Sequence, residues 1–165
     1  MLFLAKADRG IALPNPEKLE LSDEVSALFE FYEAVAEDLR IELKVDGHGQ
    51  VIGDRLMIRR AISNLLSNAL RHSHPRTDIE LAINPLEGGT ALCVTNTGDQ
   101  IDASDLPRLF DRFYRVDKAR AHPSSDGAGL GLTITKAIML AHGGSVAVTS
   151  VAGRTRFCLH FVSQQ

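Results

Sequence analysis

The sequence predicts an α+β fold, a two-layer sandwich in which helices cover a β-sheet. Two observations predict it. Apolar residues repeat at helical spacing in three segments, near 22–39, 55–73 and 130–141. Between them lie short apolar or alternating stretches that are bounded by turn residues, as strands are. Most of these stretches are joined by short turns, whereas parallel strands need long crossovers, so the pattern argues against a fully parallel sheet.

The helices have local start signals. Residues 1–9 resemble the end of a helix, and two prolines then bracket a linker. Ser22 is the expected N-cap of the helix that runs to about residue 39, with acidic residues in its first turn. Asp54 is the expected N-cap of the helix at 55–73. The expected strands are 18–21, 41–45, 50–53, 78–86, 90–97, 145–151 and 156–162, and residues 98–126 are expected to be irregular.

The composition excludes several classes of protein. The 165 residues suit one domain with a sizeable core. A net charge of −3 disfavours general DNA or RNA binding, which favours a basic surface. The sequence contains no run of 18 apolar residues, so it gives no sign of a membrane-spanning helix. Cys93 and Cys158 lie far apart without metal-ligand spacing, and both are expected to be buried, reduced thiols.

Three glycines, Gly127, Gly129 and Gly131, stand at the entrance of the third helix. Glycine costs about 1 kcal/mol relative to alanine inside a helix, so the cluster needs a reason. The dinucleotide fingerprint fails because the spacing is wrong and no strand precedes it, and the P-loop motif is absent. Two interpretations stay open: a phosphate held by free N–H groups at the helix N-terminus, or a structural loop-to-helix junction.

Two asparagines, Asn64 and Asn68, are four residues apart and share one face of the second helix, which Arg71 and His72 continue. Asparagine is a poor helix former, so two in line need partners. Either they form a structural hydrogen-bonded pair, or their oxygens serve a divalent cation such as Mg²⁺ that also contacts phosphates. In the second case Arg71 would meet a phosphate oxygen.

Two further stretches fit a nucleotide. Asn96 and Gly98 come at the end of a strand, where an amide side chain can hydrogen-bond a base edge. The segment 106–122 is locally basic within an acidic chain, as a segment that closes over a polyphosphate would be. Phe110 and Phe113, inside this segment, are expected to anchor it in the core. A solvated basic surface is the alternative for this segment.

Together these motifs resemble the catalytic, ATP-binding domain of bacterial sensor histidine kinases. NLLSNALRHS resembles the N box of that family, VTNTGDQI its first glycine box, LFDRFYRVD its F box and GAGLGLTI its second glycine box. The similarity is strongest to members that respond to copper and heavy metals. It implies the Bergerat ATP-binding fold: a mixed, mostly antiparallel sheet of about five strands, covered on one face by about three helices.

The resemblance also implies roles for particular residues. Asn68 would be the main Mg²⁺ ligand, and Asn64, at the metal–phosphate edge, would be catalytic. Arg71 would contact phosphate and His72 would pack on adenine. Asn96 stands where most of the family has an aspartate that accepts from the adenine amino group.

The remaining implied positions lie in the two glycine boxes and in the ATP lid, at about 99–128. Arg115 would be catalytic, aimed at the γ-phosphate, with Tyr114 beside it in the lid. Gly98 would make room for the base. The other nucleotide-contacting positions would be Ile101, Gly127, Gly129, Leu130, Gly131 and Leu132.

Departures from the family pattern set further expectations. Asn96 replaces the aspartate and Gln100 replaces a glycine, so we expect adenine specificity with modest affinity, because a neutral acceptor binds less strongly than a carboxylate. None of the six histidines lies in an upstream dimerisation helix. The chain is therefore expected to be a monomeric catalytic domain, residues 17–165, that follows the tail of a dimerisation helix and a linker at 1–16. Its source would be a homodimeric inner-membrane sensor, with this domain cytoplasmic and making no membrane contact of its own.

The partners implied by the resemblance are the histidine-bearing dimerisation domain of the same protein and a response regulator. Related ATPases that hydrolyse ATP need a glutamate on the asparagine helix, where this chain has Arg60. Two more alternatives are a serine kinase of the same nucleotide fold and a degenerate module that works by protein contact alone.

Overall fold

The computed structural model describes residues 13–111 and 130–163. Its helices are α2 (Leu21–Asp38), α3 (Arg55–His72) and α4 (Leu130–Ala141), with a short 3₁₀ turn at Leu106–Arg108. Its strands are β1 (Pro16–Glu20), β2 (Ile41–Gly47), β3 (Gln50–Asp54), β4 (Thr77–Leu86), β5 (Gly89–Thr97), β6 (Ser145–Val151) and β7 (Arg154–Val162).

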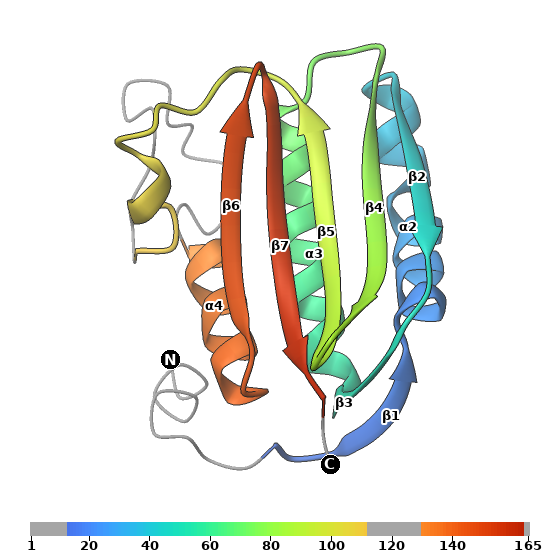
Figure 1. The fold of residues 1–165 in the computed structure, drawn as a ribbon. Helices are drawn as coiled ribbons and strands as arrows, with labels where there is room; N and C mark the ends of the chain where they lie inside the picture. The colour runs from blue at the N-terminus through green and yellow to red at the C-terminus, as the bar shows by residue number, and fades with distance from the viewer. Residues whose placement is uncertain (1–12, 112–129, 164–165) are drawn as a thin grey trace.

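Five strands form the main sheet in the order β2-β4-β5-β7-β6 (Figure 1). β2 and β4 are parallel, whereas the other three neighbouring pairs are antiparallel. β1 and β3 pair separately as a small antiparallel sheet. The expectation of a mixed, mostly antiparallel sheet of about five strands is confirmed.

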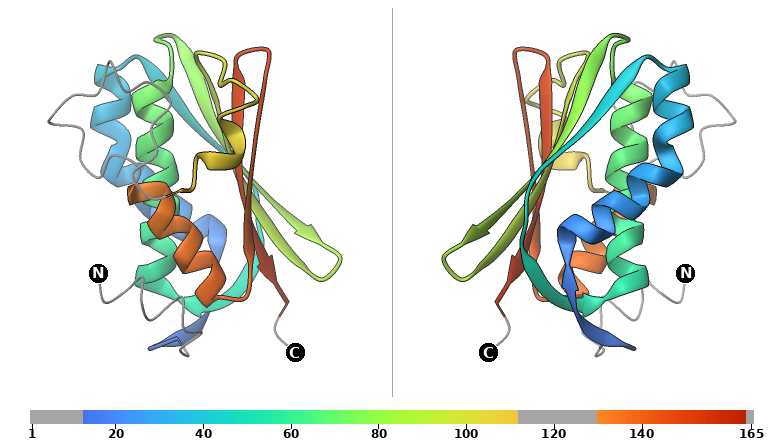
Figure 2. Two further views of the ribbon diagram at one scale, coloured as in Figure 1. Left: turned by 90° about the vertical axis from the view of Figure 1, so that its left-hand side faces the viewer. Right: turned by 90° about the vertical axis from the view of Figure 1, so that its right-hand side faces the viewer.

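The described helices lie on one face of the main sheet (Figure 2). α3 crosses its middle, with α2 on the side of β2 and α4 on the side of β6. The other face of the sheet carries no described helix. This arrangement confirms the expected two-layer sandwich.

The core lies between α3 and the central strands. The buried face of α3 follows the 3.6-residue period, and alternate residues of β4, β5 and β7 face it. The largest fully buried side chains of these elements are Ile58, Ile62, Leu65, Leu66, Ile79, Leu81, Ile83 and Leu92. The uninterrupted apolar face fixes α3 against the sheet, so its opposite face is oriented toward α4 and the proposed site.

The two predicted helix caps differ in outcome. Asp54 caps α3 as expected, because its carboxylate accepts a hydrogen bond from the Met57 N–H at 3.0 Å. Ser22 was the wrong choice for α2: the N-cap is Glu20, two residues earlier, and the Ser22 hydroxyl donates to the Glu20 carboxylate instead. Glu20 also accepts from the Gly49 N–H, so this carboxylate joins the start of α2 to the loop before β3.

The expectation of two reduced thiols is also wrong. Cys93 on β5 and Cys158 on β7 are directly opposite each other and form a disulfide, with their Cα atoms 4.1 Å apart. The sequence separation of 65 residues hid this pairing, because only the register of β5 against β7 brings the two positions together.

Within residues 13–111 and 130–163, no helix is both long enough and apolar enough to cross a membrane.

Candidate nucleotide-binding site

The asparagine face of α3 meets the start of α4. The Asn64 side-chain amide donates to the Gly131 carbonyl at 3.1 Å and lies 3.4 Å from the Thr135 hydroxyl. Thr135 is fully buried and donates in turn to the Gly131 carbonyl. These bonds use the nitrogen of the Asn64 amide, so its oxygen is the atom available to a ligand. Two motifs that are far apart in the sequence, the N box and the second glycine box, are therefore in contact.

Gly131 has no structural need to be glycine in the described part of the chain. A Cβ at this position would lie 3.8 Å from the nearest described atom, the Asn64 Cγ, which is an ordinary contact. Glycine in a helix nevertheless costs about 1 kcal/mol relative to alanine. The first N–H groups of α4 have no partners within the helix, and glycine leaves them open to an anion.

The rest of the asparagine face is exposed or partly exposed. Asn68 lies one turn after Asn64, and its side chain makes no hydrogen bond to a described residue. Arg71 and His72 follow at the C-terminal end of α3, on the surface. Partial burial of the ring, followed by the charge of Arg71, lowers the pKa of His72 from its ordinary 6.5. This shift favours the neutral form of the ring, which suits stacking on a neutral base.

Asn96 is the buried polar residue at the end of β5. It is 4% exposed, and it continues the core-facing series of Leu92 and Val94. No described residue forms a hydrogen bond with its side-chain amide. No fully buried side-chain nitrogen or oxygen of the described residues lacks a hydrogen-bond partner, so the Asn96 amide atoms reach the surface, where the edge of a ligand can pair with them. This supports an adenine contact from the asparagine that replaces the usual aspartate.

Gly98 lies where the end of β5, beside Asn96, meets the end of α3. A Cβ at Gly98 would lie 2.1 Å from the His72 carbonyl oxygen, which no backbone tolerates. The Gly98 N–H donates to the Gly153 carbonyl at 2.8 Å, and the residue forms an isolated bridge with Ser73. Gly98 is thus required by close backbone approach as well as by any space that a base needs.

The segment that leaves this junction is attached to the β6–β7 hairpin. The Gln100 amide donates to the Ser150 carbonyl at 2.6 Å and accepts from the Gly153 N–H at 2.8 Å. The Ile101 N–H donates to the Ser150 hydroxyl at 3.0 Å. Gln100, a departure from the family pattern, therefore fixes the start of the predicted lid in place of a flexible glycine. No feature of the sequence indicated this role.

Phe110 anchors the same segment farther along, as expected. Its ring packs edge-to-face on Phe157, with centroids 5.9 Å apart, and Leu109 beside it is buried. The Thr133 hydroxyl donates to the Phe110 carbonyl at 3.1 Å, which joins the segment to α4. Leu132, in the first turn of α4, is partly buried and packs against the hydrophobic core.

Several predicted site residues lie outside the described residues: Phe113, Tyr114, Arg115, Gly127 and Gly129. α4 begins at Leu130, as the sequence predicts. Within the described residues there is no group of three histidine, cysteine or acidic side chains suited to a metal ion. A metal at Asn68 would accordingly depend on amide oxygens and on phosphate oxygens, which is a donor set that Mg²⁺ accepts.

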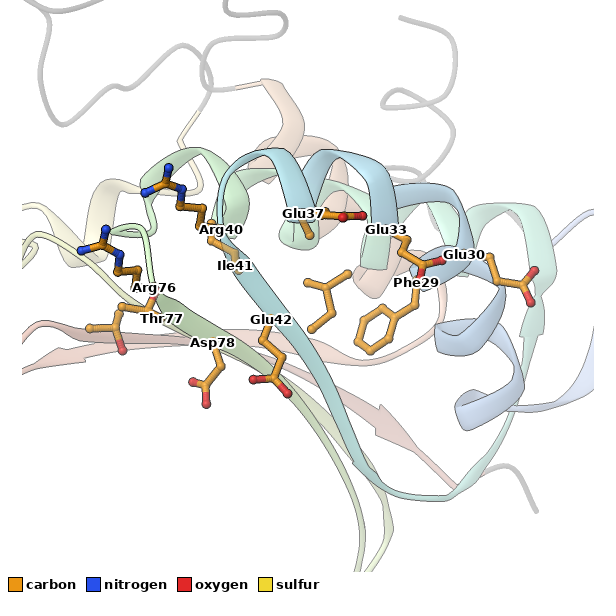
Figure 3. Close-up of a pocket in the computed structure, with 13 residues that line it drawn as sticks. Phe29, Glu30, Glu33, Glu37, Arg40, Ile41, Glu42, Arg76, Thr77 and Asp78 are labelled. Atoms are coloured by element: carbon orange, nitrogen blue, oxygen red, sulfur yellow. The ribbon is translucent and has the colours of Figure 1, made fainter.

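A wide pocket of about 900 Å³ lies elsewhere, between α2 and β2 (Figure 3). Its described lining contains none of the predicted nucleotide residues. Five carboxylates line it, among them Glu33 and Glu37, against two guanidinium groups, Arg40 and Arg76. That excess of negative charge disfavours a polyphosphate. A nucleotide polyphosphate is therefore disfavoured in this acidic pocket.

Sequence reasoning also missed a buried histidine. His142 follows α4 and is 4% exposed. Its Nδ1–H donates to the Ile138 carbonyl at 2.7 Å, and its Nε2 accepts from the Asp54 N–H at 3.1 Å, which ties the end of α4 to the start of α3. Burial lowers the pKa of His142 from its ordinary 6.5. The role is structural, and the lone histidine carried no signal for it.

Known proteins are similar to this chain in sequence and in fold. Residues 53–165 match the model of a family described as histidine kinase-, DNA gyrase B- and HSP90-like ATPase. The sensor histidine kinase CusS of Escherichia coli K12 is 49% identical over 160 residues, which are 96% of this chain and 33% of that protein.

The histidine kinase AdeS of Acinetobacter baumannii has the same fold, with a TM-score of 0.81 at 19% identity over 99% of this chain and 75% of that one. The histidine kinase ThkA, solved in complex with the response regulator TrrA, has a TM-score of 0.75 at 18% identity over 90% of this chain and 42% of that one. The chain spans about a third of the length of the curated relatives that it matches. It belongs to the histidine kinase-, DNA gyrase B- and HSP90-like ATPase family, whose members bind ATP.

Proposed function

We propose that this chain is the catalytic domain of a sensor histidine kinase, which holds Mg²⁺ and ATP at the junction of α3 and α4. The observation that carries the proposal is the contact of Asn64 with Gly131. It brings the metal-binding type of side chain next to a glycine that the described fold does not otherwise need.

In this proposal, different residues contact the metal ion, the phosphates and the base of the nucleotide. Asn68 would hold Mg²⁺, with Asn64 beside it, and the N–H groups at the start of α4 would hold phosphate. Arg71 would contact a phosphate, and His72 would pack on adenine. The buried Asn96 amide would accept from the adenine amino group, with Gly98 and Ile101 next to it and the lid, at about 99–128, above.

The reaction would be transfer of the γ-phosphoryl group of ATP to a histidine on a dimerisation domain of the same protein. The contribution of this domain is positioning and charge stabilisation, as in other phosphoryl transfers. Mg²⁺, when bound, would neutralise part of the phosphate charge. Arg115 would add a guanidinium beside the transferring group, with Tyr114 near it.

The cellular role follows from similarity to CusS. The whole protein would be a homodimeric membrane sensor, responsive to metal ions, with this domain on the cytoplasmic side. Its downstream partner would be a response regulator, in line with the complex between ThkA and TrrA. The domain by itself would be monomeric, and residues 1–16 would link it to the dimerisation helix.

The direct test is calorimetry of ATP and ADP on this chain, with Mg²⁺ and with a chelator. We expect ATP binding that is tighter with Mg²⁺, and at least about tenfold weaker in Asn68→Ala, which is the loss of roughly one good polar contact. Asn84→Ala is the matched control, because Asn84 is exposed on β4, away from α3. Equal ATP affinity of Asn68→Ala and the wild-type chain would contradict the assignment of Asn68.

Binding is distinguished from a degenerate fold by the same titration. A chain that works by protein contact alone would bind neither nucleotide. If binding is found, the histidine-bearing dimerisation domain is added with labelled ATP, and label should appear on histidine. Release of free phosphate without a labelled protein would favour an ATPase instead, although Arg60 stands where those enzymes need a glutamate.

A further inference from the structure

The face of the sheet opposite the helices carries a row of small side chains across four strands. Ala82, Cys93, Cys158 and Ala147 are successive register partners on β4, β5, β7 and β6. Cys93 and Cys158, at the centre of the row, form the disulfide that joins the two middle strands of this group. No described helix covers this face (Figure 2).

The two sulfur-bearing residues differ in access. Cys93 is 2% exposed, whereas Cys158 is partly exposed. Both line a shallow pocket of about 320 Å³, which is large enough for a small thiol. An incoming nucleophile on this face would therefore meet Cys158 first, with Cys93 behind it as the leaving group.

The surroundings of Cys158 favour this chemistry. Arg156 and His160 are two residues away on either side, so they share its face of β7, and both line the same pocket. A guanidinium near a sulfur favours the thiolate that takes part in exchange, and it attracts thiols that carry carboxylates.

We propose that Cys93–Cys158 is a thiol–disulfide exchange site that takes anionic low-molecular-weight thiols and their disulfides. A thiolate attacks the Cys158 sulfur, the Cys158–Cys93 bond breaks, and Cys93 leaves as a thiolate that takes a proton. A second thiol then attacks the mixed disulfide and releases Cys158. Two electrons pass from the two small thiols, which become a disulfide, to the pair. The proposal does not depend on nucleotide binding.

The first experiment equilibrates the folded chain with glutathione buffers of graded oxidation and counts free thiols by alkylation and mass spectrometry. We expect the fraction of bridged chain to change with the buffer while circular dichroism stays native. A bond that opens only under conditions that unfold the chain, or thiols that stay free in every buffer, would overturn the proposal.

The second experiment assigns the attacked sulfur. Cys93→Ala leaves Cys158, and Cys158→Ala leaves Cys93; alanine suits both positions because Ala82 and Ala147 continue the row. With oxidised glutathione, the folded Cys93→Ala chain should form a mixed disulfide at least about tenfold faster than Cys158→Ala. In denaturant the two rates should converge. Equal rates in the folded state, or a faster Cys93, would overturn the assignment.

The contribution of the pocket is tested in the Cys93→Ala background. Arg156→Gln should slow the reaction of Cys158 with oxidised glutathione several-fold, by about the effect of one nearby charge, and high salt should remove the difference. Arg154→Gln is the matched control, because Arg154 lies farther along β7 and outside the pocket lining. Equal slowing by both substitutions would exclude a specific role for Arg156.

Discussion

Replacement of Gly131 by alanine should make the fold more stable and nucleotide binding weaker. Gly131 is the second residue of α4, and a Cβ there meets only the Asn64 side chain, whose nearest atom, Cγ, is 3.8 Å away. The described fold therefore gains helix propensity without a clash. The added Cβ would hinder the approach of an anion to the first N–H groups of α4, so it should affect ligand binding and not the stability of the fold.

The sizes of the two effects follow from this geometry. Alanine should add about 0.5–1 kcal/mol to the free energy of unfolding, because the position is near the helix end. In a chain of this length that raises the melting temperature by about 1–4 °C. Loss of one hydrogen bond to a charged phosphate should weaken ATP binding about tenfold or more. Thermal denaturation and calorimetry measure the two effects separately.

Gly88→Ala is the matched control. Gly88 is in the β4–β5 turn at a φ of 82°, with no atom near its hypothetical Cβ, so alanine there should lower stability and leave ATP affinity unchanged. Unchanged ATP affinity in Gly131→Ala would refute the phosphate site at this helix start. A loss of stability in Gly131→Ala would refute the geometric reasoning.

Three further predictions concern the fold around the site. Gly98→Ala should cost about 2–3 kcal/mol in urea denaturation, since a Cβ 2.1 Å from the His72 carbonyl forces the backbone apart. The free energy of unfolding should fall as the pH drops through 6.5, because a His142 pKa that burial lowers leaves the unfolded chain binding more protons than the folded one; His142→Gln should reduce this slope in denaturation at pH 5 and 7.5. Arg59→Ala should cost about 1–2 kcal/mol in thermal denaturation, because Arg59 Nε is 2.5 Å from a carboxylate oxygen of Glu24, which is 3% exposed and in the variant keeps only Arg55 Nε, at 3.4 Å, as a cationic partner.

Each of these has a result that would contradict it. A Gly98→Ala chain of wild-type stability would mean that α3 and β5 separate easily at this junction. A pH slope that His142→Gln leaves unchanged would assign the slope to other groups, among them His72, whose pKa burial also lowers. For the ion pair, the double variant Arg59→Ala, Glu24→Leu should be more stable than Arg59→Ala alone, since it removes a buried carboxylate whose remaining partner, Arg55 Nε, is 3.4 Å away; equal stability of the two variants would contradict this reasoning.

Much of the fold could be predicted because local signals were strong. α3 combines a capping aspartate with an unbroken apolar face, and the structure begins and ends it within one residue of the expected range. The β6–β7 hairpin has alternating residues on both sides of a glycine turn. The Ser22 cap failed because serine can cap only where the chain enters the helix, and the chain enters α2 two residues earlier, at Glu20.

Long-range contacts could not be predicted in the same way. The register that places Cys93 opposite Cys158 depends on how β5 and β7 align, which no local pattern encodes. Gln100 was notable in the sequence only as a departure, yet its amide holds the β6–β7 hairpin through two hydrogen bonds. The resemblance assigned the asparagine and glycine motifs to one nucleotide site, whereas the contact between Asn64 and Gly131 depends on the packing of α4 on α3, which the sequence pattern does not give.

The central claim is that ATP binds where α3 meets α4 and not in the acidic pocket between α2 and β2. Backbone amide chemical shifts, recorded by NMR as Mg²⁺ and a non-hydrolysable ATP analogue are added, test it most directly. The account predicts large changes at Asn68, Gly98 and Gly131 and none at Phe29 or Leu43, which line the other pocket. Changes confined to Phe29 and Leu43 would contradict it.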